Sequence, residues 1–232
     1  MEHDLDYRFK AAGVRALVCT PDGQVADEAL RAAKNCGTVE FLMMANGARE
    51  GWLDFDAEVE KQSDVFERTE DAACGSDPML MFFTSGTTGR SKGVMLCERN
   101  FFAVMPHHVR VGQRFCQLKN DPDLLVSHMT LLPMFHLGAF GCLFTWAWMG
   151  WAQNLGSLRS FYKDLKRMPS QAMAAVPVLV QSIHHDLMTG KQDKLGDLWA
   201  LNCMSAMFDP QTLMDLHDHG MVISQLYGST ET

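Results

Sequence analysis

The feature that most constrains the fold is a regular alternation of short apolar runs with segments of helical composition. The apolar runs, which read as strands, are residues 13–19, 38–44, 78–84, 94–97, 124–132, 171–176, 198–204 and 221–227. The helical segments are residues 26–35, 98–110, 138–149, 177–189 and 210–219, with a shorter one near 55–62. Strands separated by helices in this way are typical of βαβ units. The sequence therefore predicts an α/β fold with a largely parallel sheet flanked by helices.

Several of these segments carry signals for their ends. Asp209 is a favourable N-cap for a helix that starts at Pro210, since proline suits the first helical position. The run 78–84 is predicted to be a buried strand that leads into a glycine-rich loop. Ligands of parallel sheets bind at the carboxyl ends of strands. We therefore expect the loops that follow residues 84 and 227 to share one edge of the sheet.

Composition excludes some classes of protein. The 232 residues are 47% hydrophobic, enough for one sizeable core, and the formal net charge is −8. An acidic chain is a poor partner for nucleic acid, so an anionic ligand must be held by local groups. The seven cysteines include no CxxC pair, and the histidines lack a zinc-ligand spacing. Reduced, buried thiols in a cytoplasmic protein are the expectation.

One long segment lacks charged residues altogether. No Asp, Glu, Lys or Arg occurs from Leu124 to Leu158, which by length could suggest a membrane span. Pro133, Gly138 and Gly141 interrupt it, however, and the apolar stretches between them are short. We predict a buried strand, a loop and a buried helix, and no transmembrane segment.

The stretch "TSGTTGRSKG" (84–93) combines glycines, hydroxyl side chains and one lysine. Backbone N–H groups, freed by glycine, and short hydroxyls are the donors that cradle phosphate. The stretch is not a Walker A loop, because Ser91 stands where the second glycine belongs and Gly93 follows Lys92. Taken alone, it could also be an ordinary turn between two strands.

The spelling of this stretch resembles the phosphate-binding signature of the adenylate-forming enzymes, T-S-G-T-T-G-x-P-K-G, with Ser91 in place of the proline. Three further stretches resemble motifs of that family in the same order: "LPMFHLGAFG" (132–141), "VPVLVQSI" (176–183) and "YGSTET" (227–232). The resemblance covers almost the whole chain. Within the family, the sequence looks most like the medium-chain acyl-CoA synthetases.

The resemblance implies a role for each matching residue. The residues that would surround the ATP β- and γ-phosphates are Thr84, Ser85, Gly86, Thr87, Thr88, Gly89 and Lys92. Tyr227 would pack on adenine, Thr230 would bond the α-phosphate, and Glu231 would hold Mg²⁺. His136 would border the acyl pocket and the nucleotide site, although a hydrogen-bonded core histidine is the alternative. The residues expected to act in catalysis are Lys92, His136 and Glu231.

The implied activity is that of an ATP-dependent acyl-CoA synthetase. A carboxylic acid would form an acyl-adenylate with ATP, and coenzyme A would then take the acyl group. An aryl or amino-acid substrate, with a carrier-protein thiol as acceptor, stays open within the same family. A non-catalytic module that binds a nucleotide or a partner chain is the alternative from another class, and self-association also stays open.

Two features depart from the family pattern. "CMSAMFDP" (203–210) places Met207 and Phe208 where members carry small residues that let adenine approach the backbone. The chain also stops directly after the Y-G-x-T-E motif. We therefore expect residues 1–232 to be part of the large adenylation domain, with the small C-terminal domain absent and little activity alone.

Overall fold

The computed structural model describes residues 2–84, 90–124, 126–203 and 207–230. The chain divides into two compact units, residues 1–96 and 97–232. The first three strands and the last five form separate sheets, one in each unit, and a two-stranded sheet also lies in the first. The assignment of residues 1–232 to a single large domain stays a prediction.

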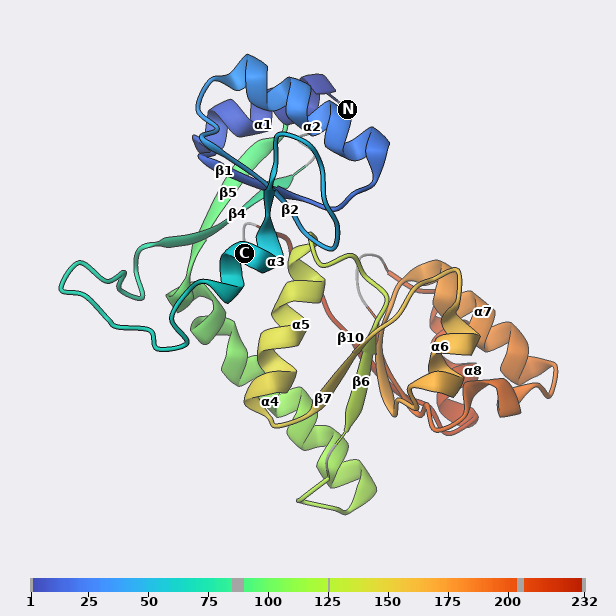
Figure 1. Cartoon of the computed structure of the whole chain (residues 1–232). Helices are drawn as coiled ribbons and strands as arrows, with labels where there is room; N and C mark the ends of the chain where they lie inside the picture. The colour runs from blue at the N-terminus through green and yellow to red at the C-terminus, as the bar shows by residue number, and fades with distance from the viewer. Residues whose placement is uncertain (1, 85–89, 125, 204–206, 231–232) are drawn as a thin grey trace. The chain divides into compact units, whose positions relative to one another are not determined.

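The first unit begins with two helices and a small parallel sheet (Figure 1). Its elements are α1 (Glu2–Ala12), β1 (Ala16–Cys19), α2 (Gly23–Cys36), β2 (Phe41–Met44), β3 (Leu53–Asp54) and α3 (Phe55–Glu60). The sheet order is β1-β2-β3, and both strand pairs are parallel. The apolar face of α2 is built from alanines, which let it lie close to β1 and β2. Gly37, at φ 74°, ends α2 as the Cys36-Gly37 signal predicts.

The strand before the glycine-rich loop differs from its prediction. Strand β4 (Pro78–Thr84) pairs with β5 (Lys92–Cys97) in a two-stranded sheet of the first unit. Its residues are all exposed or half-buried, so it is not the buried strand of a parallel sheet that its apolar composition suggested. The expectation that this loop and residues 227–232 share one sheet edge is therefore wrong: the two strands before them belong to different sheets. Composition could not reveal this, because apolar side chains also occur on half-exposed ribbons.

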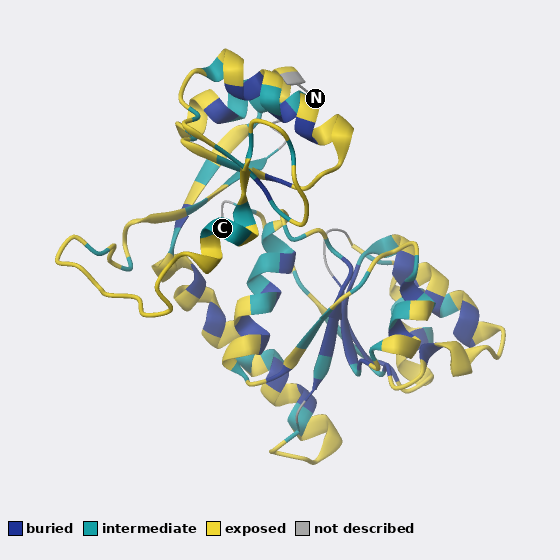
Figure 2. Cartoon of the chain, in the orientation of Figure 1, coloured by how far each residue is buried: buried dark blue, intermediate teal, exposed yellow. Residues whose placement is uncertain are grey.

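The second unit holds most of the core (Figure 2). Its helices are α4 (Glu98–Lys119), α5 (Leu137–Trp148), α6 (Phe161–Arg167), α7 (Pro177–Met188) and α8 (Pro210–Asp218), with a 3₁₀ turn at Gln192–Leu195. Its strands are β6 (Ser127–Thr130), β7 (Ala152–Leu155), β8 (Ala172–Ala175), β9 (Ala200–Cys203) and β10 (Val222–Gln225). All five are parallel in the order β10-β9-β8-β6-β7. This is the predicted α/β architecture.

The strands alternate side chains between two different cores. Met129, Met173 and Leu201 face one cluster, which α6, α7 and α8 cover. The neighbouring positions Ala172 and Ala200 face the other cluster, together with Phe115 of α4 and Trp146 of α5. The period of two along each strand thus produces a sheet buried on both faces between two helix layers.

The uncharged segment folds as part of this core. Strand β6 and helix α5 match the predicted strand and helix, but β7 within the same segment was not predicted. Its sequence, "AQNL", has two polar residues at its centre and no β-branched or aromatic residue, so it carries little signal for a strand. In the described part of the chain, no helix combines the length and apolar character needed to cross a membrane.

Candidate functional site at the carboxyl edge of the second sheet

The sheet of the second unit has a topological switch point. The chain leaves β6 for β7 on one side and returns to β8 on the other side of β6. In open parallel sheets, ligands bind in the crevice at the carboxyl ends of the strands that flank such a point. β6 and β8 flank this point, and the loops at the same carboxyl edge include residues 131–136 after β6, residue 176 after β8 and residues 226–230 after β10. Three of the four family-like motifs therefore meet at one edge of this sheet.

His136 lies on the loop after β6 as the N-cap of α5. Its Nδ1 accepts a hydrogen bond from the backbone N–H of Gly138 at 3.0 Å. Because Nδ1 is an acceptor, the neutral ring carries its proton on Nε2. The side chain is exposed, so the alternative of a buried core histidine is wrong. This arrangement leaves Nε2–H as a donor at the edge where a ligand would bind.

Tyr227 and Thr230 follow β10 at the same edge. Tyr227 is fully exposed, and Thr230 is half-buried. On the neighbouring loop after β9, Met207 is 90% exposed, whereas Phe208 packs against the core. Of the two bulky residues that depart from the family pattern, only Met207 therefore projects from the edge. Glu231, the predicted Mg²⁺ ligand, lies outside the described residues.

The glycine-rich loop belongs to the first unit. Ser85, Gly86, Thr87, Thr88 and Gly89 lie outside the described residues. Thr84 is the last residue of β4, and Lys92 is the first residue of β5 with an exposed side chain. The Tyr7 hydroxyl donates a hydrogen bond to the Ser91 carbonyl at 2.9 Å. The backbone is therefore held at the position where the family signature has proline.

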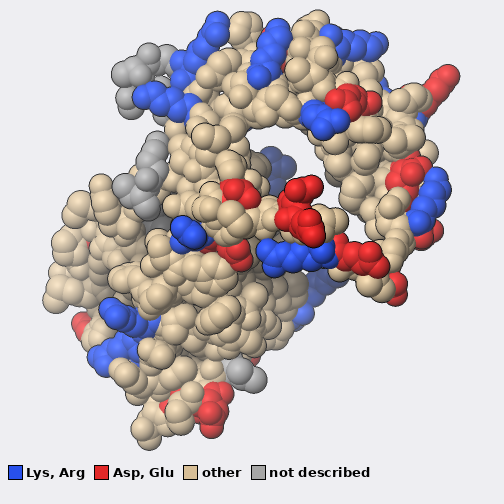
Figure 3. Space-filling model, turned by 90° about the vertical axis from the view of Figure 1, so that its left-hand side faces the viewer, with Lys and Arg blue, Asp and Glu red and all other residues tan. Residues whose placement is uncertain are grey.

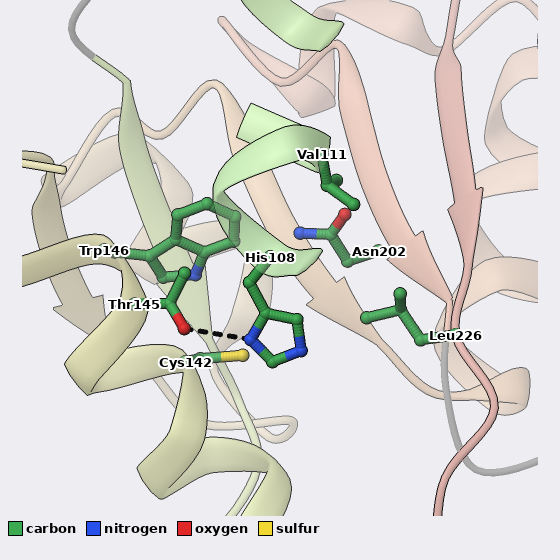
Figure 4. Close-up of a pocket in the computed structure, with 7 residues that line it drawn as sticks. All are labelled: His108, Val111, Cys142, Thr145, Trp146, Asn202 and Leu226. Atoms are coloured by element: carbon green, nitrogen blue, oxygen red, sulfur yellow. Dashed lines mark hydrogen bonds between the residues drawn. The ribbon is translucent and has the colours of Figure 1, made fainter. Parts of the chain in front are cut away.

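A small cavity lies under the edge of the second sheet (Figure 4). It measures about 20 Å³, which is room for about one water molecule. Helix α4 contributes His108, helix α5 contributes Thr145 and Trp146, and β9 contributes Asn202. Leu226, which also lines the cavity, directly precedes Tyr227. The cavity therefore adjoins the edge that carries the family-like motifs.

The polar groups of this cavity are incompletely paired. Thr145 Oγ1 donates to the Gly141 carbonyl at 3.0 Å, so it accepts the 2.9 Å bond from His108 Nδ1–H. His108 Nε2 is then left as an acceptor. Within the described residues, Asn202 Oδ1 and Trp146 Nε1 are buried without a hydrogen-bond partner. Buried groups of this kind are normally satisfied by water or by a ligand.

Burial also lowers the pKa values of two histidines in this region. Burial, with the neighbouring His107 as a smaller cause, lowers the pKa of His108. His128 of β6 is fully buried, and burial lowers its pKa to about 3. Its Nε2 lies 3.4 Å from Asn202 Nδ2, so the neutral ring can accept that bond. Both imidazoles are therefore neutral near pH 7.

The sequence pattern did not lead us to predict the polar residues in the core of this unit. His128 and Asn202 each interrupt an apolar run, "LLVSHMTLL" and "LWALNCM". A polar residue inside an apolar strand was the available signal, since such groups are costly to bury without a purpose or a partner. The position of His108 opposite Thr145 depends on how α4 packs on α5, which no local pattern encodes.

The cysteines agree in part with their prediction. All seven are free; Cys19, Cys142 and Cys203 are buried, whereas Cys74 is exposed. Burial raises the pKa of Cys142 to about 11 and that of Cys203 to about 12.

Among the residues whose positions are described, no group of three or more His, Cys, Asp or Glu could hold a metal ion. On the face shown in Figure 3, basic and acidic side chains are interspersed, and neither sign covers it continuously.

The fold and the order of the motifs are those of the adenylate-forming enzyme family. The profile of the AMP-binding enzyme family matches residues 1–232. The chain therefore belongs to the AMP-binding enzyme family, and the resemblance seen in the four motifs is confirmed.

Its relatives of known function include CoA ligases. The chain is 26% identical to an indoleacetate–CoA ligase of Aromatoleum aromaticum, over 82% of this chain and 36% of the relative. It is also 26% identical to a long-chain-fatty-acid–CoA ligase of Thermus thermophilus, over 99% of this chain and 41% of the relative. The chain thus spans about two fifths of the length of these relatives.

Solved structures of similar fold agree with this assignment. A long-chain-fatty-acid CoA ligase described as putative, from Rhodopseudomonas palustris, superposes with a TM-score of 0.76 at 16% identity, covering 100% of this chain and 55% of that one. An anthranilate CoA ligase in complex with anthranoyl-AMP gives a TM-score of 0.75 at 17% identity, covering 96% of this chain and 42% of that one. At these identities the likeness confirms the fold alone.

Proposed function

We propose that this chain is the nucleotide-binding part of an ATP-dependent acyl-CoA synthetase. The match of the AMP-binding family to residues 1–232 carries this proposal, with "TSGTTGRSKG" and "YGSTET" as its phosphate and adenine motifs. In the reaction, a carboxylate oxygen attacks the α-phosphorus of ATP and pyrophosphate leaves. The thiol of coenzyme A then attacks the acyl carbonyl, and AMP leaves.

The residues act by positioning and by neutralising charge. Lys92 and the hydroxyls of Thr84, Ser85, Thr87 and Thr88 would hold the terminal phosphates. Tyr227, exposed on the edge of the sheet, offers a flat ring for adenine. Thr230 offers a hydroxyl to the α-phosphate, and His136 offers Nε2–H to the acyl carboxylate region. Glu231 would supply a hard carboxylate oxygen to Mg²⁺.

An aryl-CoA ligase is the second candidate within the family. The observation that favours it is the similarity to a ligase for an aryl acid, the indoleacetate–CoA ligase of Aromatoleum aromaticum, which is 26% identical over 82% of this chain.

Nucleotide binding to this chain tests the site assignment. Titration calorimetry with ATP and with AMP is expected to show that Lys92→Ala weakens ATP binding and leaves AMP binding unchanged, because Lys92 would contact the terminal phosphates only. The Lys34→Ala variant, an exposed lysine on α2, is the control. Tyr227→Ala should weaken the binding of both nucleotides roughly 5- to 150-fold, the range of base–aromatic stacking, while Tyr227→Phe keeps the ring.

Turnover tests the activity itself. The intact mass of the native polypeptide is measured first, so that carboxylate-dependent ATP–pyrophosphate exchange is assayed on the whole protein. Octanoate, palmitate, indoleacetate and anthranilate form the substrate panel. Exchange with octanoate or palmitate supports the first candidate, and exchange only with the aryl acids supports the second. Nucleotide binding without exchange for any acid would favour a non-catalytic nucleotide-binding module.

A further inference from the structure

A single residue of α1 contacts both chain segments that flank the glycine-rich loop. The Tyr7 hydroxyl donates to the Ser91 carbonyl at 2.9 Å, across 84 positions of the sequence. The Tyr7 ring meets the Phe83 ring edge-on, with centroids 6.3 Å apart and an interplanar angle of 72°. Phe83 precedes the last residue of β4, and Ser91 precedes the first residue of β5. Tyr7 therefore joins the end of one strand to the start of the next.

Two arginines add to this contact between α1 and the two-stranded sheet. The guanidinium carbon of Arg90 lies 5.4 Å from the centroid of the Tyr7 ring. That of Arg8, the next residue of α1, lies 5.5 Å from the centroid of the Phe83 ring. Guanidinium groups are attracted to aromatic rings at such distances. Tyr7, Arg8 and Phe83 are half-buried, and all four residues belong to the first unit. Aromatic and cation–π contacts thus hold the ring that carries the hydroxyl.

The hydrogen bond from Tyr7 fixes the plane of a peptide bond. The carbonyl of Ser91 and the N–H of Lys92 belong to the same planar peptide unit. When the Tyr7 hydroxyl holds the carbonyl oxygen, it also sets the direction of the Lys92 N–H and the position of the Lys92 Cα. The side chain of Lys92 is exposed and extends from this fixed base. A charged group that is oriented before its ligand arrives loses less entropy on binding.

Residue 91 itself supplies little of this restraint. The family signature has proline at this position, and a proline ring fixes φ near −65°. Serine leaves φ free, so the backbone before Lys92 has more conformations to lose when it is ordered. A hydrogen bond from outside the loop removes part of that freedom. The Tyr7 hydroxyl therefore acts on the backbone where serine has taken the place of proline.

We propose that Tyr7 is a positioning residue for phosphate binding, which acts through the Ser91 carbonyl to orient Lys92 toward the terminal phosphates of ATP. This inference rests on the proposed function, in which Lys92 contacts those phosphates. Tyr7 itself contacts no nucleotide. Loss of its hydroxyl therefore weakens ATP binding and leaves the binding of AMP, which lacks these phosphates, unchanged. A residue that only stabilised the fold would not distinguish the two nucleotides.

Calorimetric titration of the folded chain with ATP and with AMP tests this role. Tyr7→Phe keeps the ring and its contacts with Phe83 and Arg90 but removes the hydroxyl. It is expected to weaken ATP binding about 2- to 10-fold, the weight of one neutral hydrogen bond, and to leave AMP binding unchanged. Tyr162→Phe is the matched control, because the Tyr162 hydroxyl also donates a hydrogen bond, to Asp186 in the second unit. The control should change neither affinity. An equal loss of ATP and AMP binding in Tyr7→Phe overturns the proposal.

A proline at position 91 provides a rescue experiment. Ser91→Pro fixes φ at residue 91 and restricts the residue before it, so less backbone freedom is left for the Tyr7 hydroxyl to remove. The loss of ATP affinity caused by Tyr7→Phe should therefore be smaller in the Ser91→Pro background than in the wild type. An equal or larger loss in that background overturns the proposal, because Tyr7 would then act independently of the backbone at residue 91.

Hydrogen exchange of the chain without nucleotide measures the restraint itself. Tyr7→Phe should speed exchange at the amides of residues 90–92 and leave those of α7 unaffected. Faster exchange with unchanged ATP affinity would mean that the contact only stabilises the fold, and it overturns the proposal.

The Lys92→Ala variant distinguishes failure of this inference from failure of the proposed function. If Lys92→Ala weakens ATP binding but Tyr7→Phe changes neither ATP binding nor exchange, the positioning role is wrong and the phosphate role of Lys92 stands. If Lys92→Ala leaves ATP binding unchanged, the proposed phosphate site is wrong, and the positioning role of Tyr7 fails with it.

Discussion

At the residue scale, burial of single polar groups shapes the chemistry of the second unit. His128 occupies a strand position that faces a core, where a hydrophobic side chain would be expected. The neutral imidazole is the form that this environment tolerates, because an isolated buried cation is far more costly. Its hydrogen-bond partner is the side chain of Asn202, which lies two strands away in the same sheet. These two residues connect the packing of the sheet to the cavity under its functional edge.

The free energy of unfolding should depend on pH because His128 is buried. Burial lowers the pKa of His128 to about 3, below the unfolded value of about 6.5, so between these values the unfolded chain binds one more proton. The free energy of unfolding should therefore fall as the pH decreases, by about 2 kcal/mol between pH 6.5 and 5. Urea unfolding at both pH values checks this result in the wild type and in His128→Gln, which should lack that component. An equal loss in both proteins would contradict it.

Thiol reactivity should follow burial in the same way. Burial raises the pKa of Cys142 to about 11 and of Cys203 to about 12, so neither carries much thiolate at pH 8. Iodoacetamide should label exposed Cys74 rapidly and spare these two until urea unfolds the chain. Peptide mass spectrometry identifies the labelled sites, with Cys74→Ser as the control. Labelling of Cys203 in the folded protein as fast as Cys74 would show that its strand opens readily.

At the element scale, α2, α3 and α8 each begin where an aspartate side chain caps the helix. Asp22, Asp54 and Asp209 each accept a hydrogen bond from a backbone N–H three residues later. α8 is the best example for a prediction, because the aspartate that precedes it, the proline at its first position and its bounds were all readable in the sequence. The sheet edge at β9 and β10 depends on this short helix, which packs on the core through Leu216.

Removal of this cap should cost a measurable amount of stability. Asp209 Oδ2 accepts from Thr212 N at 2.9 Å, and Asp209→Ala leaves that donor without its partner. The loss should be about 1 kcal/mol in the free energy of unfolding, measured with urea. Asp209→Asn keeps an oxygen at the same position and should lose less. If the two variants were equally destabilised, the cap would not be the cause.

At the scale of the whole molecule, the two units differ in how much of their chain is packed. The second unit buries a sheet between two layers of helices, whereas the first contains a long irregular segment, residues 61–77, that is mostly exposed (Figure 2). Phe66 in this segment is 89% exposed. Few contacts hold such a stretch, so it is the expected place for cleavage.

Limited proteolysis should therefore begin in the first unit. Trypsin is expected to cut first after Lys61 or Arg68, both exposed in this segment, and later in the helices of the second unit. Mass spectrometry of the early fragments identifies the first cut. The double variant Lys61→Gln/Arg68→Gln should delay the first cleavage. A first cut within α7 or α8 would instead place the weakest part of the chain in the second unit.

The sequence by itself determined the α/β class, the positions of most strands and helices, and the family. Strand and helix periodicity, glycine and proline signals, and four ordered motifs are local properties, so they are readable without a structure. The residues 85–89 and 231 predicted to bind phosphate and Mg²⁺ lie outside the described chain, and their roles remain predictions.

Only the tertiary structure decided which of these elements share a sheet. It separated β4 from the parallel sheet, added β7 at the edge, and exposed His136 and Tyr227 at the carboxyl edge. It also brought His108, Thr145 and Asn202 around one cavity. The physical reason is that strand partners and side-chain contacts join residues far apart in the chain, whereas propensity and pattern act over a few neighbouring residues.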